Sequence, residues 1–332
     1  MDRETDSMAA FAPDIGFNLI RCRLAGTETI VGPPTLATLA ARSSEYGVPL
    51  LWPPGRIGGG TFAFGGHDYA YPLNEGANHL HGEIRRMPWQ IAALEADEER
   101  GAAAVAELRL SGEAGRSGYY PHEVVLRLTW RLSGGRIEGA LEAINEGKDI
   151  APYGFGLHPY FAMPAGEGSA ELVAPVALQY SADADGVFRR LPIRTPLCEA
   201  LGDGLTPDRL PADVDHFVFH LEERARSCRI ALPEAGVQFR FDFDEAFGYL
   251  IVFKPPWADA VSLEPWTCVS DAFNSPLPAE WTGAAGLRPG ERRTAAWSWR
   301  VEPMTAAGAA GMAGMAGMAG MAGMAEPAPT KG

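Results

Sequence analysis

Glu264 is a side chain whose surroundings in the sequence suggest chemistry. It follows an apolar run that begins at Val261, and Pro265 and Trp266 come directly after it. Carboxylates are seldom buried without a partner, and an apolar wall raises the pKa of a carboxyl group toward neutral pH. Glu264 is therefore a candidate general base, although a solvent-exposed glutamate at a strand end would have the same local sequence.

A histidine among aromatic and apolar neighbours is the second candidate. His158 lies in residues 154–161, where phenylalanine and leucine precede it and proline, tyrosine and phenylalanine follow it. Histidine titrates near neutral pH, so a modest shift of its pKa by burial is enough to tune it as a proton donor. The alternative is a core histidine whose two ring nitrogens are both hydrogen-bonded.

Two nearby segments carry groups that suit the recognition of hydroxyls. Arg56 lies in residues 54–60, and Asn78 and His81 lie in residues 78–82. A guanidinium presents a fixed fork of donors, and an amide both donates and accepts. These groups are able to hold a polyhydroxylated ligand in a fixed geometry, whereas a solvated polar loop is the simpler alternative.

The second of these segments has another interpretation, as a metal site. His79, His81 and Glu83 alternate along the sequence, so a β-strand would place all three on one face. Such a triad is typical of cupin-like metal enzymes. That hypothesis leaves Glu264 and His158 without a role.

A period of two residues dominates the hydrophobic pattern of the chain. Residues 126–132 alternate apolar and polar side chains, and residues 136–144 do so again after a turn at residues 133–135. Alternation of this kind is typical of half-buried strands, and two such runs around a glycine-rich turn predict a β-hairpin. Residues 237–243 repeat the alternation, and residues 249–253 indicate a more fully buried strand.

Helix signals are weaker than strand signals. Residues 36–42 and 91–98 contain good helix formers, and each is expected to be a short helix or else a strand. No regular alternation of strands with helices is visible. With 39 glycines and 27 prolines separating many short strands, we predict an all-β fold, a large antiparallel β-sandwich.

Composition restricts the class of protein. The 332 residues are 46% hydrophobic and 21% charged, as expected of a globular chain. A net charge of −14 argues against a nucleic-acid partner, because a phosphate-binding surface needs a basic stripe. Residues 1–17 lack the features of a signal peptide, and no window suits a membrane span. Four widely spaced cysteines without a CxxC pair indicate reduced thiols, no structural zinc site and a cytoplasmic location.

The end of the chain differs in composition from the rest. Gly-Met-Ala occurs five times from residue 311 to residue 325. Glycine at every third position disfavours a helix, and the repeat lacks the proline of collagen. We therefore expect a flexible N-terminus over residues 1–14, one sandwich domain over residues 15–303 and a disordered low-complexity tail over residues 304–332.

In their order along the chain, the candidate segments resemble the aldose 1-epimerase (galactose mutarotase) family over most of the expected sandwich. Residues 55–57 resemble the family's Asn-Arg-Ile, and residues 78–82 resemble its Asn-x-Leu-His-Gly. Residues 158–161 match its His-Pro-Tyr-Phe, and residues 264–265 fall where its catalytic glutamate and proline fall. Residues 214–216 resemble its sugar-binding aspartate segment.

The resemblance implies a galactose mutarotase-like sandwich and an isomerase that interconverts the α and β anomers of a free aldose. No cofactor and no metal are implied. Glu264 would take the proton from the anomeric hydroxyl while His158 gives one to the ring oxygen. His81 would hold that oxygen or a neighbouring hydroxyl.

The resemblance also implies which groups bind the sugar. Arg56, Asn78 and Asp215 would fix the remaining hydroxyls. Trp266 and Trp89 would stack on the sugar or pack in the core. The expected partner is a small sugar, with no nucleic acid and no membrane, and the protein is expected to be a monomer or a homodimer.

Departures from the family pattern leave the preferred sugar open. Gly55 replaces the usual asparagine, and Trp266 replaces the glutamine common among galactose mutarotases. A hexose-6-phosphate 1-epimerase is one alternative, with Arg85 and Arg86 as phosphate ligands. A carbohydrate-binding protein on the same fold, without turnover, is another. A retaining glycosidase would need a second catalytic carboxylate, for which no candidate stands out.

Overall fold

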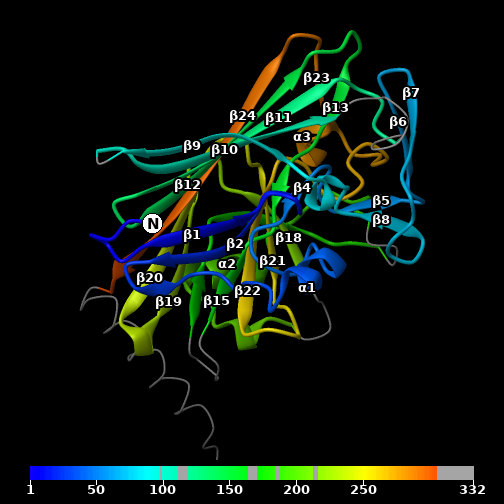
Figure 1. Ribbon diagram of the computed structural model, residues 1–332. Coiled ribbons are helices and arrows are strands. Elements are labelled where there is room, and N and C mark those ends of the chain that lie inside the picture. The colour runs from blue at the N-terminus through cyan, green and yellow to red at the C-terminus, as the bar shows by residue number, and fades with distance from the viewer. Residues whose placement is uncertain (98, 111–118, 164–169, 184–186, 212–215, 305–332) are drawn as a thin grey trace, which may run out of the picture.

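The computed structural model of this chain describes residues 1–97, 99–110, 119–163, 170–183, 187–211 and 216–304 (Figure 1). Two large antiparallel sheets and four small ones account for the strands in these residues. The prediction of an all-β antiparallel sandwich is confirmed. The large sheets contain eight and seven strands.

The eight-stranded sheet is built from long strands that pair antiparallel throughout. From one edge to the other its strands are β16 (Glu171–Val173), β19 (Ser227–Leu232), β20 (Val237–Phe243), β24 (Arg292–Pro303), β12 (Arg136–Asn145), β11 (Val124–Ser133), β10 (Gly101–Leu110) and β9 (Gln90–Asp97).

The seven-stranded sheet is built from shorter strands. In order they are β17 (Val176–Tyr180), β18 (His216–Leu221), β21 (Tyr249–Phe253), β22 (Ala260–Trp266), β14 (Gly156–Leu157) and β4 (Leu50–Leu51), and β15 (Tyr160–Ala162) also pairs with β22. Because β14 and β15 both pair with β22, the short connection between them is held against that strand. His158 lies in this connection.

Smaller elements cover the edges and ends of the two sheets. The small sheets are β1 (Met8–Ala12) with β2 (Asn18–Leu24) and β3 (Thr27–Glu28), β13 (Ala151–Tyr153) with β23 (Ala285–Leu287), β5 (Arg56–Gly58) with β8 (Asn78–Leu80), and β6 (Thr61–Phe64) with β7 (His67–Ala70). The helices are α1 (Leu36–Ala41), α2 (Pro196–Asp203) and α3 (Ala279–Thr282), with 3-10 turns at Ile84–Arg86, Pro207–Arg209 and Pro233–Ala235.

The hairpin of β11 and β12 shows how the sequence pattern produces the sheet. Gly134 and Gly135 connect the two strands with φ angles of 55° and 72°. Positive φ at both central residues gives the turn whose twist matches that of the strands, and glycine adopts it without steric cost. The predicted hairpin is therefore confirmed, and β20 and β21 coincide with the runs predicted over residues 237–243 and 249–253.

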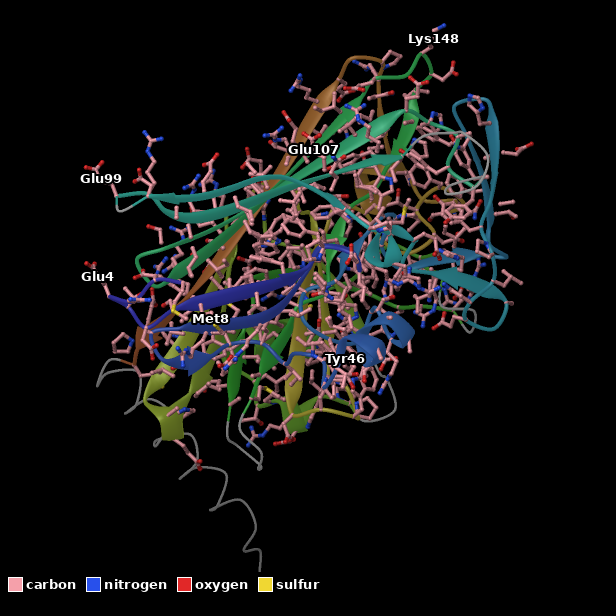
Figure 2. All side chains as sticks on the ribbon, in the orientation of Figure 1. Glu4, Met8, Tyr46, Glu99, Glu107 and Lys148 are labelled. Atoms are coloured by element: carbon pink, nitrogen blue, oxygen red, sulfur yellow. The ribbon has the colours of Figure 1, made fainter. Side chains whose placement is uncertain are left out.

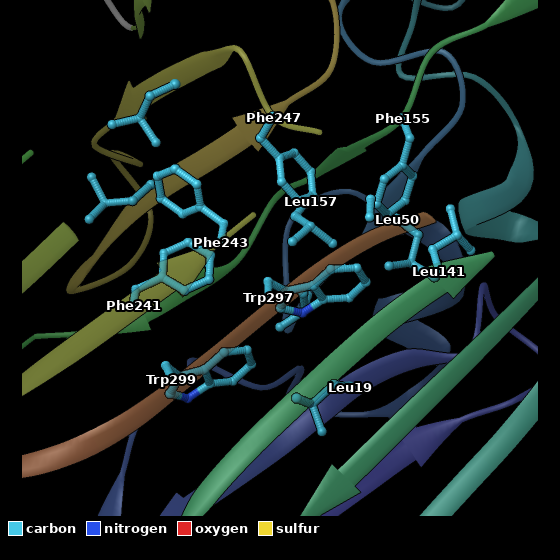
Figure 3. Packing of buried hydrophobic residues seen from close by; sticks show 14 of the residues in the cluster. Leu19, Leu50, Leu141, Phe155, Leu157, Phe241, Phe243, Phe247, Trp297 and Trp299 are labelled. Carbon is cyan, nitrogen blue, oxygen red and sulfur yellow. The ribbon is translucent and has the colours of Figure 1, made fainter. Parts of the chain in front are cut away.

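The main core fills the space between the two large sheets (Figure 3). Trp297 and Trp299 of β24 extend from the eight-stranded sheet toward the other layer. The ring of Trp297 lies 5.7 Å from that of Phe155, and the ring of Trp299 lies 5.7 Å from that of Phe161. Aromatic contacts of this kind stabilise the fold by more than the area they bury. They therefore hold the seven-stranded sheet against the eight-stranded one.

Strand β22 presents two different faces. Val261 and Leu263 belong to the main core, whereas Ser262 and Glu264 alternate with them and point to the opposite side. All seven residues of β22 are buried, because segments around β5 and β8 cover that side of the sheet. The chemistry-bearing residues of β22 thus lie on the outer side of the sandwich, beneath this cover.

Of the two alternatives expected for residues 91–98, a short helix or a strand, the described residues 91–97 adopt the strand. They belong to β9, which pairs with β10 as the edge strand of the large sheet and leaves Leu94 73% exposed. The helix formers there are overridden by strand pairing. The strands also begin before residue 15, since β1 pairs with β2. Helix α1 agrees with the helix expected over residues 36–42, and Thr35 caps it by accepting a hydrogen bond from the Thr38 N–H.

Charged side chains occur at the surface, and the cysteines lie in the interior. Figure 2 shows Glu99 and Lys148 at the outer tips of strands and loops, where both are exposed. The four cysteines are free and buried, as expected for inert thiols. Among the described residues, no helix is both long and apolar enough to cross a membrane. The repeats that begin at residue 311 lie outside the described residues.

Candidate active site

A cavity of about 300 Å³ opens on the outer side of the seven-stranded sheet. Its walls combine ionisable, polar and aromatic side chains. They are Ser44, Glu45, Gly55, Arg56, Glu75, Leu80, His81, His158, Tyr160, His216, Ile251, Phe253, Pro256, Trp257, Glu264, Trp266 and Ser270. A volume of this size suits a small molecule.

A larger and more open groove of about 430 Å³ crosses the outer face of the eight-stranded sheet. Its charged side chains are engaged with neighbours, since Arg136 contacts Glu138 and Asp242 contacts Arg240. None of the residues that line it is a histidine. The smaller cavity, where groups of perturbed pKa converge, is therefore the candidate site.

Glu264 occupies the floor of the cavity and is 1% exposed. It lies in the middle of the sheet, opposite Ile251 of β21. Burial raises the pKa of its carboxyl group well above the usual value. Its Oε2 atom has no hydrogen-bond partner within the described part of the chain. An acceptor left unpaired at the edge of a cavity is costly unless a ligand satisfies it.

His158 lies directly beside this carboxyl group. Its Nε2 atom is 3.4 Å from Oε1 of Glu264, and its Nδ1 atom is 3.0 Å from Oγ of Ser262. The backbone N–H of His158 donates to the carbonyl of Pro49, which fixes the position of the residue. Burial lowers the pKa of the imidazole to about 3.

The contact between Glu264 and His158 is an ion pair only when the proton resides on the histidine. The raised pKa of Glu264 and the lowered pKa of His158 both favour the neutral arrangement. The two arrangements contain the same number of protons and differ only in which group carries the shared one. Such a pair titrates as a unit.

His81 forms the opposite wall and has a backbone φ of 67°. Its ring lies 5.3 Å from that of His158 and 6.0 Å from that of Trp266, nearly perpendicular to both. Its Nδ1 atom accepts a hydrogen bond from the Gly55 N–H at 3.3 Å. Burial lowers the pKa of His81 well below its usual value. The ring is therefore neutral with its hydrogen on Nε2, which makes it a donor.

His79 does not join His81. Its ring is fully buried against Tyr71, its Nδ1 atom is 2.6 Å from the carbonyl of Pro72, and its Nε2 atom is 3.7 Å from Glu83. The expected placement of residues 79, 81 and 83 on one strand face is wrong, because β8 ends at Leu80 and His81 adopts a left-handed conformation. Within the described ranges, no three His, Cys, Asp or Glu side chains are grouped as metal ligands.

Arg56 anchors a polar cluster at another part of the wall. Its guanidinium donates two hydrogen bonds of 2.7 Å to the two carboxylate oxygens of Glu75, and its Nη1 atom is 3.2 Å from Nε2 of His216. Bidentate pairing of this kind holds a guanidinium in a fixed plane. The sequence pattern points to Arg56 but not to Glu75 or His216, which come from separate segments and lack a local signal.

Three other residues expected to contact the sugar do not line the cavity or lie outside the described residues. Asn78 lies in β8, where its backbone pairs with Gly58 and with Glu75, and it is not among the residues that line the cavity. Asp215 lies outside the described residues. Trp89 is 3% exposed and packs against Phe17 in the main core, so the core-packing alternative holds for it.

Aromatic side chains shape the remaining walls. Trp266 is buried at the base, while Trp257 stands at the rim and is 39% exposed. Tyr160 stacks on His158 with ring centroids 4.7 Å apart. The ring centroids of Phe253 and Trp257 lie 5.6 Å apart. Trp257 was not predicted as a site residue, although a tryptophan directly after two prolines suggests a fixed turn.

Known proteins resemble this chain in sequence over most of its length. The model of the family described as aldose 1-epimerase matches residues 3–298. The uncharacterized protein YphB of Escherichia coli K12 is 27% identical over 291 residues, which cover 83% of this chain and 90% of that protein. Galactose mutarotase of Sus scrofa is 26% identical over 149 residues, 44% of this chain and 40% of that protein.

Solved structures show the same fold. A galactose mutarotase-like protein from Clostridium acetobutylicum has a TM-score of 0.82 at 21% identity, covering 90% of this chain and 94% of that one. A galactose 1-epimerase from Lactobacillus acidophilus has a TM-score of 0.75 at 16% identity, covering 92% and 93%. Because the family model spans nearly the whole sandwich, this chain belongs to the aldose 1-epimerase family.

Proposed function

We propose that the protein is an aldose 1-epimerase that interconverts the α and β anomers of a free aldose. The observation that supports this most directly is the 3.4 Å separation of Nε2 of His158 and Oε1 of Glu264 at the floor of the cavity. An acid and a base this close can act only on neighbouring atoms of a ligand. The anomeric oxygen and the ring oxygen of a sugar are such neighbours, because both are bonded to the same carbon.

Ring opening at this pair is a double proton transfer. The Glu264 carboxylate takes the proton of the anomeric hydroxyl, the bond between the anomeric carbon and the ring oxygen breaks, and Nε2 of His158 protonates that oxygen. The aldehyde forms and no net charge is created. After rotation about the bond between the first two carbons, the reverse transfers close the ring to the other anomer and restore both groups.

The bound sugar also stabilises the charged arrangement of the pair that ring opening requires. A hydroxyl that donates to Glu264 favours the carboxylate, and a ring oxygen that accepts from His158 favours the imidazolium. His81, a neutral donor, is placed to hydrogen-bond the oxygen that gains charge as the ring opens.

The charges around the cavity favour an unphosphorylated sugar. Arg56 is paired with Glu75, and Glu45 of the lining is paired with Arg42. Arg85 is 3% exposed, and neither it nor Arg86 is among the residues that line the cavity. A phosphate would therefore meet guanidinium groups that are already paired with carboxylates, which disfavours the hexose-6-phosphate alternative.

Polarimetry on freshly dissolved α-glucose and α-galactose, with their 6-phosphates beside them, tests the proposal. We expect the protein to accelerate the approach to anomeric equilibrium for at least one free aldose, above the spontaneous rate, and to act weakly on the phosphates. Acceleration confined to the phosphates would favour the 6-phosphate epimerase. Binding of a free aldose without acceleration of any sugar would favour a carbohydrate-binding protein.

A further inference from the structure

Ser262 is a fully buried hydroxyl two residues before Glu264, on the same face of β22. Its Oγ atom is 2.9 Å from the carbonyl oxygen of Pro159 and 3.0 Å from Nδ1 of His158. A carbonyl oxygen can only accept, so the single hydroxyl proton of Ser262 points to Pro159. The lone pairs of Oγ are then left to accept a hydrogen bond from the Nδ1–H of His158.

We propose that Ser262 is the positioning residue that fixes the tautomer of His158, with the hydrogen on Nδ1 and the bare nitrogen at Nε2. Either ring nitrogen of a neutral histidine can carry the hydrogen. The hydrogen-bond partner of one nitrogen therefore decides whether the other nitrogen is protonated or bare. The two partners of Ser262 belong to the consecutive residues His158 and Pro159. The serine therefore also holds the imidazole ring in place relative to the backbone next to it.

The group that can donate to a bare Nε2 is Glu264. The Tyr160 hydroxyl lies 3.4 Å from Nε2, but it donates to the carbonyl of Ser44 at 2.7 Å and has no proton left to give. Oε1 of Glu264 also lies 3.4 Å from Nε2, and because burial keeps a proton on that carboxyl group, Glu264 can donate a hydrogen bond to Nε2. The proton that Nε2 gains and loses is thus exchanged with Glu264 or with a ligand.

The two histidines of the cavity then have opposite tautomers. Nδ1 of His81 accepts from the Gly55 N–H, which leaves its hydrogen on Nε2, whereas Nδ1 of His158 donates to Ser262. One ring presents a permanent donor to the cavity and the other presents a site that a proton can enter. This division of roles rests on the proposed function for its effect on turnover, but the tautomers themselves do not.

Side-chain ¹⁵N NMR of the full-length protein at neutral pH measures the tautomers directly, because protonated and bare ring nitrogens differ in chemical shift. We expect His158 to be neutral with hydrogen on Nδ1, and His81 to be neutral with hydrogen on Nε2. Hydrogen on Nε2 of His158 in the unmodified protein would overturn the proposal, whatever its activity towards sugars.

Ser262→Ala then tests the cause. We expect the His158 signals to shift to the other tautomer or to a mixture, and turnover to fall roughly tenfold or more with little change in KM. Ser262→Thr, which retains the hydroxyl, should restore the tautomer. Ser298→Ala is a matched control, since Ser298 is a buried serine of β24 that accepts from Arg136 away from the cavity.

The outcomes separate this proposal from the proposed function. An unchanged tautomer and unchanged turnover in a folded Ser262→Ala variant would show that the serine positions nothing. A tautomer shift in a protein that accelerates no aldose would retain the structural assignment and remove the epimerase. If Ser262→Ala does not fold, the tautomer of the unmodified protein decides the assignment and Ser262→Cys, which keeps the volume but accepts weakly, decides the cause.

Discussion

His158 and Glu264 face each other at 3.4 Å on the outer side of the seven-stranded sheet, and both side chains are almost completely buried. Strand pairing explains how residues so distant in sequence meet. β14 and β15, on either side of His158, both pair with β22, which carries Glu264. Because burial opposes charge on each group, the neutral arrangement of the pair is favoured over the ion pair.

Replacement of Glu264 by glutamine should abolish nearly all mutarotation while sugar binding persists. The amide keeps the shape of the carboxyl group but cannot accept a proton. General base catalysis is typically worth ~10²-fold or more, so the rate above the spontaneous background should fall at least that much in polarimetry. Glu142→Gln, at a surface pair with Arg292, is the control. More than about a tenth of the activity in Glu264→Gln would contradict the base assignment.

The same substitution should change how stability depends on pH. The pKa of Glu264 in the folded state is raised above its unfolded value. Stability from this group is therefore fully present below the unfolded pKa and is lost as pH rises through the folded pKa. Thermal unfolding from about pH 5 to about pH 9 should show Glu264→Gln gaining stability relative to the unmodified protein as pH rises. Parallel curves would show that Glu264 is not a buried acid.

His158 should produce the opposite dependence in acid. Its folded pKa is lowered to about 3 from a usual value of 6.5. Its contribution to stability is therefore present above the unfolded pKa and is lost as pH falls from 6.5 toward 3. His158→Gln, which does not titrate, should lose less stability over this interval. Denaturant unfolding at several pH values measures the difference, and equal acid sensitivity in both proteins would contradict it.

The hydrophobic pattern of the sequence predicted the parts of the site that lie on regular strands. The continuous apolar run over residues 249–253 predicted β21, and the apolar residues before Glu264 marked the candidate base, because short apolar runs are typical of buried strands. His158 was found because its flanking aromatic residues indicate burial.

Contacts between segments distant in the sequence determined the features that the local sequence did not predict. Residues 91–97 contain helix formers, yet pairing with β10 makes them a strand. The left-handed backbone at His81 turns its side chain away from His79 and breaks the alternation that favoured a metal triad. Glu75 and His216 reach Arg56 from loops and strands far apart in the chain, and no spacing rule connects them.

The different surroundings of His81 and His79 lead to different expected phenotypes. His81→Ala should lower turnover roughly 10²-fold, because a donor to the oxygen that gains charge is lost. His79→Ala should instead lower the free energy of unfolding by about 1 to 3 kcal/mol, through loss of a buried hydrogen bond, with turnover per folded molecule nearly unchanged.

Kinetics and unfolding of both histidine variants, together with kinetics in the presence of a chelator, give the comparison. Proton transfer at a hemiacetal needs no Lewis acid, so we expect chelation to leave turnover intact. Equal losses of turnover in His79→Ala, His81→Ala and Glu83→Ala, with activity restored by added metal, would favour the metal site instead.

Gly82 sets the backbone that presents His81 to the cavity, and it should not tolerate a side chain. Its φ is +58°, and a Cβ atom there would lie 1.8 Å from the carbonyl oxygen of Trp52. Left-handed strain alone costs about 1 kcal/mol, and the clash forces Trp52 or Gly82 to move in addition. Gly82→Ala should therefore destabilise the protein by about 3 kcal/mol and lower turnover by displacing His81.

Gly134→Ala isolates the strain, since Gly134 has a similar φ of +55° with open space around it. Denaturant unfolding of the two variants should differ by about 2 kcal/mol, and equal losses would show that the approach of Trp52 does not constrain this turn.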